Sequence, residues 1–364
     1  MSGLIAALGR QPRGLLVLEG FLWIAILGVL DYFAPPDLSF LIFYVAPVLF
    51  LVWFVGRWAG LLGAFASAAF WTYEDVLSPH AYPSTGVADW NIAVRLVFLA
   101  LFVWVVADLK RVLQREKQAE QERLERDVRI AQEVQARLFP RMAPQIPNLQ
   151  CQGVCRPARG IAGDYYDFVT LDGGHAGIAV ADVAGKGLPA ALLMASLQAA
   201  LRSLVSRANE APAVLARDLN AQLCELTEPT RFATLFWGVF DERGRTLNYV
   251  NAGHNAPLLM RKAGAVDRLA AGGRPLGVFP DSEYRMDSVS LAAGDVLVVY
   301  TDGVTEAPDA EEREFGEERL LESVRANEDR PVDEICRGVL KAVDAYQAGL
   351  PQQDDMTLVV ARVT

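Results

Sequence analysis

Residues 233–251, ATLFWGVFDERGRTLNYVN, contain a β-hairpin pattern. Two runs rich in β-branched and aromatic residues, 233–241 and 246–251, are separated by the polar segment ERGR at 242–245, which has the glycine of a tight connection. Strands joined by so short a connection pair antiparallel, whereas parallel neighbours need a long crossover. The pattern therefore predicts largely antiparallel sheets.

Short strand-like runs and turns alternate over the rest of the C-terminal part of the chain. Long helical segments are inserted in pairs between them, which favours an α+β fold, an antiparallel β-sandwich flanked by helices, over a doubly wound sheet. The expected strands are 149–156, 166–171, 175–182, 233–241, 246–251, 257–261, 296–301 and 356–363. The expected helices are 188–206, 213–226, 317–327 and 332–348.

The N-terminal part is unusually apolar. Of the 364 residues in the chain 52% are hydrophobic, which is high for a wholly soluble protein. The excess lies in residues 1–108, which hold only four Lys or Arg residues and contain four apolar runs. Each run is close to the roughly 20 residues that a helix needs to cross the hydrocarbon core of a membrane. We therefore predict an all-α region of four transmembrane helices, at 14–33, 38–56, 58–73 and 91–108.

The basic residues near these runs lie on one side of the predicted membrane. They precede the first run, separate the second from the third and follow the fourth, whereas the connections 34–37 and 74–90 contain no Lys or Arg. The positive-inside rule then places both ends of a multi-pass chain in the cytoplasm. A cleavable signal peptide is not expected, because the first run is long and is followed at once by further spans.

Three ionisable residues, Glu19, Asp31 and Arg95, lie inside or at the edge of the predicted spans. One interpretation is that their side chains reach the headgroups from the helix ends. The other is a sensory pocket on the outer side, because an ionisable group in a membrane is costly enough to indicate function. The residues expected to form that pocket are Asp31, Pro35, Pro36, Tyr44, Trp71 and Glu74.

A long helix is predicted from Ala107 to Leu138, since this segment has no Gly or Pro and Pro140 provides a stop. Residues 109–139 would then link the membrane region to a catalytic domain at 140–364. A heptad seam runs through the second half only, so two interpretations stay open: a solvated single helix, or a parallel homodimer that passes a membrane signal inward. The seam positions are Leu124, Val128, Ala131, Gln135 and Leu138.

The part of the chain after residue 108 is acidic, with 30 basic and 37 acidic residues. This balance argues against nucleic acid as its main partner. The four cysteines, at 151, 155, 224 and 336, lack the paired spacing of a zinc site. They are expected to be reduced packing residues, which implies a reducing compartment.

Four aspartates each lie where a strand-like run ends or a tight turn opens: Asp164, Asp182, Asp302 and Asp354. Folding is expected to bring these carboxylates into one site. Oxygen ligands without convergent His or Cys suit Mg²⁺ or Mn²⁺ rather than zinc, and the main-chain carbonyl of Val183 is a further candidate ligand. Two such divalent metal ions can activate a water toward a phosphorus centre. The pattern therefore indicates phosphate chemistry.

Residues from about 125 to 364 resemble the SpoIIE-like, or RsbU-like, branch of the PPM-type metal-dependent serine/threonine phosphatases. The resemblance covers nearly the whole cytoplasmic part and rests on eight segments in a fixed order. These are RIAQEVQARLFP (129–140), AGDYYDF (162–168), ADVAGKGLPAALLMA (181–195), FATLFWGVFD (232–241), LNYVNAGHNAPLL (247–259), PLGV (275–278), VLVVYTDGVTEA (296–307) and DDMTLVVARV (354–363).

The resemblance implies specific roles for the aspartates. Asp164 would ligate one metal ion and Asp182 both, with the carbonyl of Val183 as a further ligand. Asp302 and Asp354 would complete the second ion, and Asp354 matches the family ligand better than Asp355 does. The implied reaction is direct attack of an activated water on phosphoserine or phosphothreonine, and the implied substrate is a STAS-domain anti-anti-sigma factor in a bacterium.

Some residues depart from the family pattern or have no assigned role. Ala162 stands where the family usually has a glycine, which is tolerated if φ is negative there. His254 has the chemistry of a general acid but is interpreted as structural. Three basic residues are candidates for binding the substrate phosphate, each with a solvated surface position as the alternative: Arg156, Arg159 and Lys186.

The sequence thus supports a membrane-anchored signalling phosphatase of the bacterial inner membrane, with its N-terminus and phosphatase domain in the cytoplasm. The alternative is a non-catalytic membrane receptor whose phosphatase-like domain has become a binding module. The intact aspartates favour the enzyme.

Overall fold

The computed structural model describes residues 8, 11–33, 41–77, 85–140, 142–143, 146–205, 211–228 and 230–364, without the side chains of 41, 71, 72, 74–77 and 85–88. The chain divides into two compact units, residues 1–124 and 125–364. The division into a membrane region, a linker and a catalytic domain at 1–108, 109–139 and 140–364 stays a prediction.

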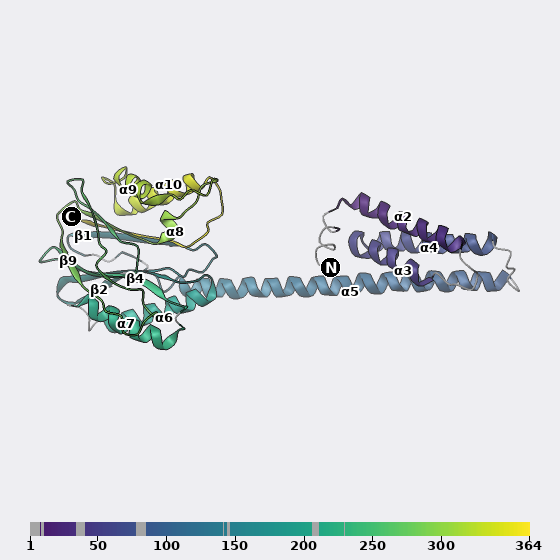
Figure 1. Ribbon diagram of the computed structural model, residues 1–364, viewed down its shortest axis with the longest axis horizontal. Coiled ribbons are helices and arrows are strands. Elements are labelled where there is room, and N and C mark those ends of the chain that lie inside the picture. Colours follow the sequence, from purple (N-terminus) through teal and green to yellow (C-terminus); the bar gives the residue numbers. More distant parts are fainter. Residues whose placement is uncertain are drawn as a thin grey trace. The chain divides into compact units, whose positions relative to one another are not determined.

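The N-terminal unit is helical, and a helix covers most of each predicted apolar run (Figure 1). Within the described residues two segments, Arg13–Tyr32 and Asp89–Gln135, are long and apolar enough to cross a membrane. The prediction of four spans therefore stays open. The elements are α2 (Arg13–Tyr32), α3 (Leu41–Phe50), the π-helix η1 (Leu51–Val55), α4 (Arg57–Leu77) and α5 (Thr85–Gln135), which continues into the second unit.

Apolar side chains cover much of the surface of the N-terminal helices. Trp58 is 68% exposed, Phe65 is 65% exposed and Val97 is 67% exposed. Monomeric soluble proteins rarely expose large contiguous apolar patches, which mark interaction or membrane sites. This surface agrees with a lipid environment for the unit.

Asp31 lies inside the N-terminal unit rather than at its rim. It is 7% exposed, and the hydroxyl of the fully buried Tyr44 lies 3.4 Å from its Oδ2. Two members of the predicted sensory pocket thus meet, while the interpretation that Asp31 reaches the headgroups stays a prediction. Pro35 and Pro36, and the side chains of Trp71 and Glu74, lie outside the described residues.

Helix α5 differs from the predicted linker because it begins at Thr85 and runs without a break to Gln135. The last two seam positions pack within the second unit: the side chain of Gln135 is hydrogen-bonded to Ala162, and Leu138 contacts a core cluster there. These two residues therefore stabilise their own domain. Leu124 and Val128 stay exposed, and a dimer through the helix remains a prediction.

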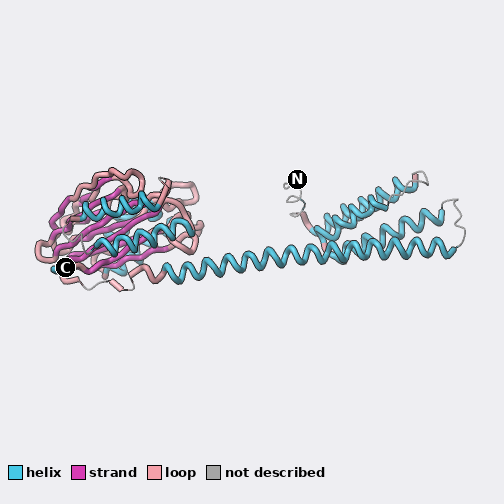
Figure 2. Tube along the Cα trace, turned by 90° about the horizontal axis from the view of Figure 1, so that it is seen from below, coloured by secondary structure: helices cyan, strands magenta, loops and turns pink. Residues whose placement is uncertain are grey.

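The second unit contains two sheets that lie face to face (Figure 1). Figure 2 looks onto the magenta strands, with cyan helices crossing in front of them. One has the order β1-β11-β10-β6-β7, and the other β2-β3-β4-β5-β8 with β9 also paired to β5. All pairs are antiparallel except β5 with β8. The strands are β1 (Leu149–Arg156), β2 (Tyr165–Thr170), β3 (His175–Val183), β4 (Ala233–Asp241), β5 (Thr246–Ala252), β6 (Leu258–Met260), β7 (Val266–Arg268), β8 (Gly272–Gly273), β9 (Asp287–Ser290), β10 (Val296–Tyr300) and β11 (Met356–Val363).

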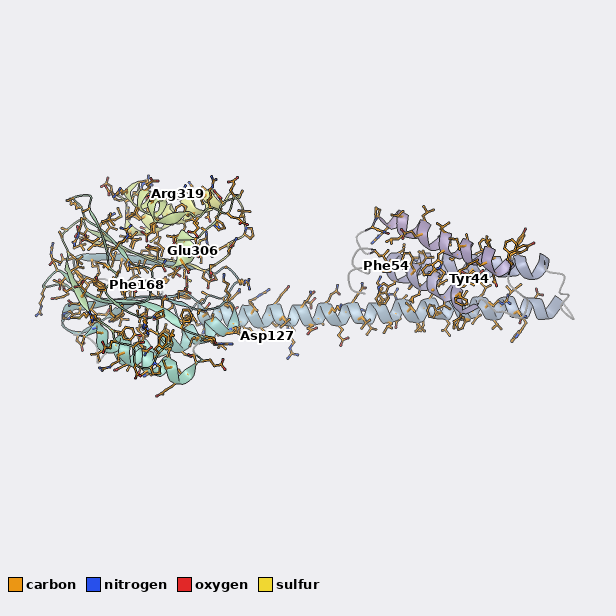
Figure 3. All side chains as sticks on the ribbon, in the orientation of Figure 1. Tyr44, Phe54, Asp127, Phe168, Glu306 and Arg319 are labelled. Carbon is orange, nitrogen blue, oxygen red and sulfur yellow. The ribbon has the colours of Figure 1, made fainter. Side chains whose placement is uncertain are left out.

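A buried apolar cluster fills the space between the sheets. It joins residues such as Phe168, Phe236 and Phe240 of one sheet to Val299 and Val359 of the other. Figure 3 shows Phe168 in the middle of this layer. Side chains point alternately to the two faces of a strand, so one face of each sheet meets this cluster and the other is covered from outside. The central strands are therefore buried on both faces, and β10 is buried at every position.

Helices cover both outer faces of the sandwich (Figure 1). One pair packs on the sheet of β2 to β5, and the other helices pack on the sheet of β1, β10 and β11. The fold is thus the predicted α+β antiparallel sandwich flanked by helices. The helices are α6 (Leu188–Leu204), α7 (Pro212–Leu226), α8 (Asp302–Thr305), α9 (Gly316–Arg325) and α10 (Val332–Gln347), with a short 3₁₀ helix η2 (Asp172–Gly174).

Candidate active site

Asp164 lies at the start of β2 and is almost completely buried, with 2% of its surface exposed. Its Oδ2 accepts a hydrogen bond of 2.7 Å from the Thr301 hydroxyl, which lies at the end of β10 in the other sheet. Burial, and next the carboxylate of Asp182, raise the pKa of Asp164 well above its usual value. The two sheets therefore meet at this aspartate.

Asp182 lies in β3, which pairs with β2 so that Tyr165 is opposite Ala181. Asp164 and Asp182 are each one residue beyond that pair, on adjacent strands of one sheet. The pKa of Asp182 is raised to about 6 by burial, and then by the carboxylates of Asp302 and Asp354. Asp182 thus interacts with acids from both sheets.

Asp302 and Asp354 come from adjacent strands of the other sheet. Asp302 follows β10 as the first residue of α8, and Asp354 precedes β11. Burial, and then Asp354, raise the pKa of Asp302. All four predicted aspartates are thus brought to one edge of the sandwich.

The acidic edge has donors that fit a divalent cation, because they are carboxylate oxygens whose mutual repulsion a cation would relieve. Within the described residues, however, no three His, Cys, Asp or Glu side chains are arranged closely enough to hold a metal ion. Asp354 has its Oδ2 2.6 Å from Nζ of Lys186. That ion pair occupies one of the predicted ligands.

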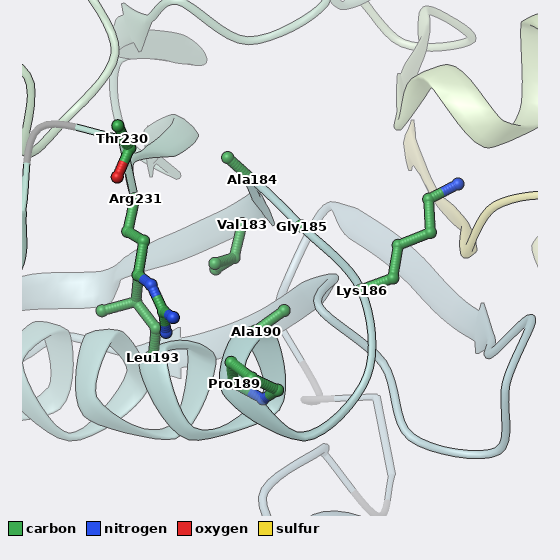
Figure 4. Close-up of a pocket in the computed structure, with 9 residues that line it drawn as sticks. All are labelled: Val183, Ala184, Gly185, Lys186, Pro189, Ala190, Leu193, Thr230 and Arg231. Atoms are coloured by element: carbon green, nitrogen blue, oxygen red, sulfur yellow. The ribbon is translucent and has the colours of Figure 1, made fainter.

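Lys186 belongs to the turn between β3 and α6. Both neighbouring glycines, Gly185 and Gly187, have positive φ, at 106° and 76°. The Lys186 ammonium group also donates to the carbonyl of Gln353 at 2.9 Å. In Figure 4 its side chain extends away from the other residues of the recess, such as Arg231.

The two other basic candidates are placed differently. Arg156 is engaged by Asp344, at 2.8 Å, on α10. Arg159 is exposed on the loop before Asp164. Lys186 is the one of the three that contacts a predicted ligand.

Asp355 has a role that the sequence did not indicate. Its Oδ1 accepts from the backbone N–H of Ala158 at 2.7 Å, and its Oδ2 from that of Gly163 at 2.6 Å. Both carboxylate oxygens thus hold the loop that leads to Asp164. This agrees with Asp354, and not Asp355, as the predicted ligand.

Close backbone approach explains two glycines at this edge. A Cβ on Gly303 would lie 2.0 Å from the carbonyl oxygen of Asp355, which excludes any side chain there. A Cβ on Gly163 would lie 3.2 Å from the carbonyl oxygen of Val183, which is tighter than ordinary contact. The predicted carbonyl ligand Val183 therefore lies beside the loop that carries Asp164.

Ala162 replaces a family glycine without strain. Its φ is not positive, and the residue is completely buried. Its N–H donates to Oε1 of Gln135, and its carbonyl accepts from Nε2 of the same side chain, both at 2.8 Å. The end of α5 thus holds the backbone at Ala162, two residues before Asp164. The heptad spacing had instead predicted that Gln135 lies in a seam between two helices.

A second buried network, which the sequence analysis did not predict, begins at Tyr165, the residue after Asp164 in the chain. The carboxylate of Asp167, which is fully buried, accepts two hydrogen bonds of 2.8 Å from Arg202 on α6. The Tyr165 hydroxyl donates to the same carboxylate at 2.5 Å. The second acid in the AGDYYDF segment was the available signal. This network fixes α6 on the strand that follows Asp164.

His254 is buried, and burial lowers its pKa to about 4. Its Nδ1 lies 2.8 Å from the hydroxyl of Thr234, whose residue is opposite Asp182 in the sheet. The backbone N–H of His254 donates to Oδ1 of Asn251. A neutral, enclosed imidazole of this kind agrees with the structural interpretation.

Comparison with known proteins gives consistent matches for this unit. The family model for Stage II sporulation protein E (SpoIIE) matches residues 172–364. The phosphoserine phosphatase RsbU of Bacillus subtilis is 31% identical over 246 residues, which cover 66% of this chain and 71% of RsbU. Protein IcfG of Synechocystis sp. is 28% identical over 284 residues, but this chain spans only 44% of its length.

Solved structures share the fold. The PP2C domain of SiaA from Pseudomonas aeruginosa superposes with a TM-score of 0.61 at 22% identity, over 68% of this chain and 99% of that domain. The structure of RsbU and RsbW domains from a Mycobacterium tuberculosis protein gives a TM-score of 0.52 at 25% identity, over 60% and 61% of the two chains. The family model, the relative and the fold agree, and this chain belongs to the SpoIIE family of protein serine/threonine phosphatases.

Proposed function

We propose that the chain is a membrane-anchored signalling phosphatase that hydrolyses phosphoserine or phosphothreonine on a cytoplasmic regulatory protein. The observation that carries this proposal is the convergence of four aspartates from two sheets at one edge, where Lys186 contacts Asp354. Such a site has the charge and the donor atoms for divalent metal ions.

Two ions, Mg²⁺ or Mn²⁺, are assigned to this edge. Asp164 would hold one ion, Asp182 both, and Asp302 and Asp354 the other, with the carbonyl of Val183 as a further ligand. When bound, the ions supply a water that is nucleophilic at neutral pH and neutralise the phosphate oxygens. The residues of the chain hold this arrangement through the hydrogen bonds of Thr301 and Asp355 described above.

The proposed substrate is a phosphorylated STAS-domain anti-anti-sigma factor. Relatives named phosphoserine phosphatase support the phosphoserine part of this proposal: RsbU and RsbP of Bacillus subtilis, the second of which is 26% identical over 207 residues. The STAS domain is what the family resemblance implies. The proposed location is the inner membrane of a bacterium, with the N-terminus and the phosphatase unit cytoplasmic. The exposed apolar surface of the N-terminal helices supports this location, and the exposed part of α5 supports a homodimer.

Substitution of Asp182 tests the activity. In the full chain in detergent, Asp182→Asn should lower Mn²⁺-dependent hydrolysis of an aryl phosphate by roughly a thousandfold or more, because metal-ion activation is worth several kcal/mol. Asp267→Asn is the matched control, since Asp267 is exposed on β7 and pairs with Arg261.

Two results would contradict the proposal. One is an Asp182→Asn protein with activity within tenfold of the unchanged chain. The other is an unchanged chain that binds no Mn²⁺ in a calorimetric titration and hydrolyses neither aryl phosphate nor phosphoprotein. The second result would favour the non-catalytic receptor instead.

A further inference from the structure

Lys186 lies between two recesses at the acidic edge. One, of about 360 Å³, is lined by Val183, Gly185, Leu193 and Arg231 among others. The other, of about 180 Å³, is lined by Glu306, Gln347 and Asp354 among others. Lys186 lines both recesses, and it shares the second with Asp354.

The surroundings of Lys186 are strongly acidic. Among the ion pairs of the described residues, Lys186 with Asp354 is the only one that involves any of the four aspartates. The ammonium group also lowers the pKa of Asp302 and Glu306, which burial otherwise raises. Lys186 is thus the cation that a substrate phosphate would meet beside these carboxylates.

The ion pair between Lys186 and Asp354 is weak enough for either side chain to take another partner. The two side chains are 38% and 43% exposed, and pairs this exposed shift an equilibrium by roughly fivefold at most. The turn around Lys186 lies in open space, because a Cβ on Gly185 or on Gly187 would have no neighbour within 4 Å. A flexible four-carbon stem can therefore swing without repacking the core.

We propose that Lys186 is a phosphate-binding residue that Asp354 holds in the metal-free protein and releases to the substrate when divalent ions take Asp354. This inference rests on the proposed function and names the group that recognises its substrate. A carboxylate that ligates a divalent ion no longer neutralises the lysine, and a phosphate dianion is then the strongest anion within its reach. The ammonium would be a binding residue, positioned by the Gly185–Gly187 turn.

The proposal predicts effects of opposite sign from one substitution. In Lys186→Gln, Mn²⁺ should bind about two- to fivefold more tightly, because a competitor for Asp354 is gone. Inorganic phosphate should inhibit, or bind to the Mn²⁺-loaded protein, roughly tenfold or more weakly, as a hydrogen bond to a charged group is lost. The KM for aryl phosphate should rise by a similar factor, with a smaller change in kcat.

The measurements are calorimetric titrations of the full chain in detergent with Mn²⁺ and then with inorganic phosphate. Lys341→Gln removes the same charge from an exposed position on α10 and should change neither affinity. Lys186→Arg should recover part of the phosphate affinity, since it keeps the charge.

Other outcomes overturn the proposal. If Lys186→Gln weakens both Mn²⁺ and phosphate, the lysine only supports the turn; if it changes neither, the lysine is a solvated surface residue. These results are separate from a failure of the proposed function. An unchanged chain that hydrolyses no phosphate ester would end the phosphatase proposal, while the phosphate titration would still decide the role of Lys186.

Discussion

The two sheets contribute aspartates of different character to the same edge. Asp164, from the sheet of β2 and β3, is 2% exposed and hydrogen-bonded to Thr301, and its raised pKa is first a result of burial. Asp354, from the sheet of β10 and β11, has a side chain that is 43% exposed and paired with Lys186. The half of the site around Asp164 is therefore set by packing, whereas the position of Asp354 in the other half is set by charge. Changes in the two halves should affect different quantities.

The sharpest contrast is between two neighbours, Asp354 and Asp355. Asp355→Ala should destabilise the fold by about 3 to 6 kcal/mol, because two backbone N–H groups lose charge-assisted hydrogen bonds. Asp354→Ala should cost less, about 1 to 2 kcal/mol of stability, because it breaks an exposed ion pair and one hydrogen bond of 2.9 Å from the backbone N–H of Asp355. It should nevertheless remove metal-dependent activity. Denaturant unfolding and aryl phosphate hydrolysis of the full chain measure the two effects.

Hydrogen exchange gives an independent check on this pair. The backbone amides of Ala158 and Gly163 should exchange faster in Asp355→Ala than in the unchanged chain. Their exchange rates should not change in Asp354→Ala. Equal loss of stability in the two variants would show that the exposed half is also set by packing, and the contrast would then fail.

His254 tests the packed half through pH. Its pKa of about 4 in the folded state lies below the usual value of 6.5. Between these two pH values the imidazole is therefore protonated in the unfolded chain and neutral in the folded chain. Stability should therefore be full above pH 6.5, fall as the pH drops toward 4, and lose about 3 kcal/mol over that window.

The contribution of His254 must be measured as a difference between two proteins, since Asp182, whose pKa is raised to about 6, titrates in the same range. His254→Gln should flatten the fall in stability between pH 6.5 and 4 relative to the unchanged chain. A variant whose stability follows the same pH curve would mean that the imidazole is reached by water and that this side of the site is not closed.

Ala162→Gly should have the smallest effect on activity. The backbone at 162 does not have positive φ, so glycine relieves no strain; it loosens the unfolded chain and removes a completely buried methyl group. The cost should be about 1 to 2 kcal/mol of stability, with activity within twofold of the unchanged chain. A rise in activity well beyond that, measured on aryl phosphate at saturating Mn²⁺, would show that the methyl group displaces Asp164.

Local patterns in the sequence predicted most of the sandwich. The expected strands 149–156, 233–241 and 356–363 match β1, β4 and β11, because each is long and has a buried apolar face. The short strands β7 and β9 were missed, since their residues are mostly exposed and carry no alternation. The four aspartates were identified from their ordered motifs, whereas their contacts were not.

Contacts between distant residues were the part that the sequence could not provide. Gln135 has a heptad position, but its amide matches the backbone of Ala162, which is 27 residues away. Asp355 looks like a spare copy of Asp354 until the loop before Asp164, 192 residues away, is placed against it. Hydrogen-bond partners of this kind depend on the completed fold and leave no periodic trace.

The hydrogen bond from Thr301 to Asp164 joins the two sheets at the acidic edge. The distance between the two sheets therefore also sets the distance between the carboxylates that they carry. Apolar side chains between the sheets, such as Phe168 and Val299, act as spacers, and their size sets the distance between the sheets. Evolution could then tune the metal site of this domain by changing the volume of its interior, with every ligand left in place.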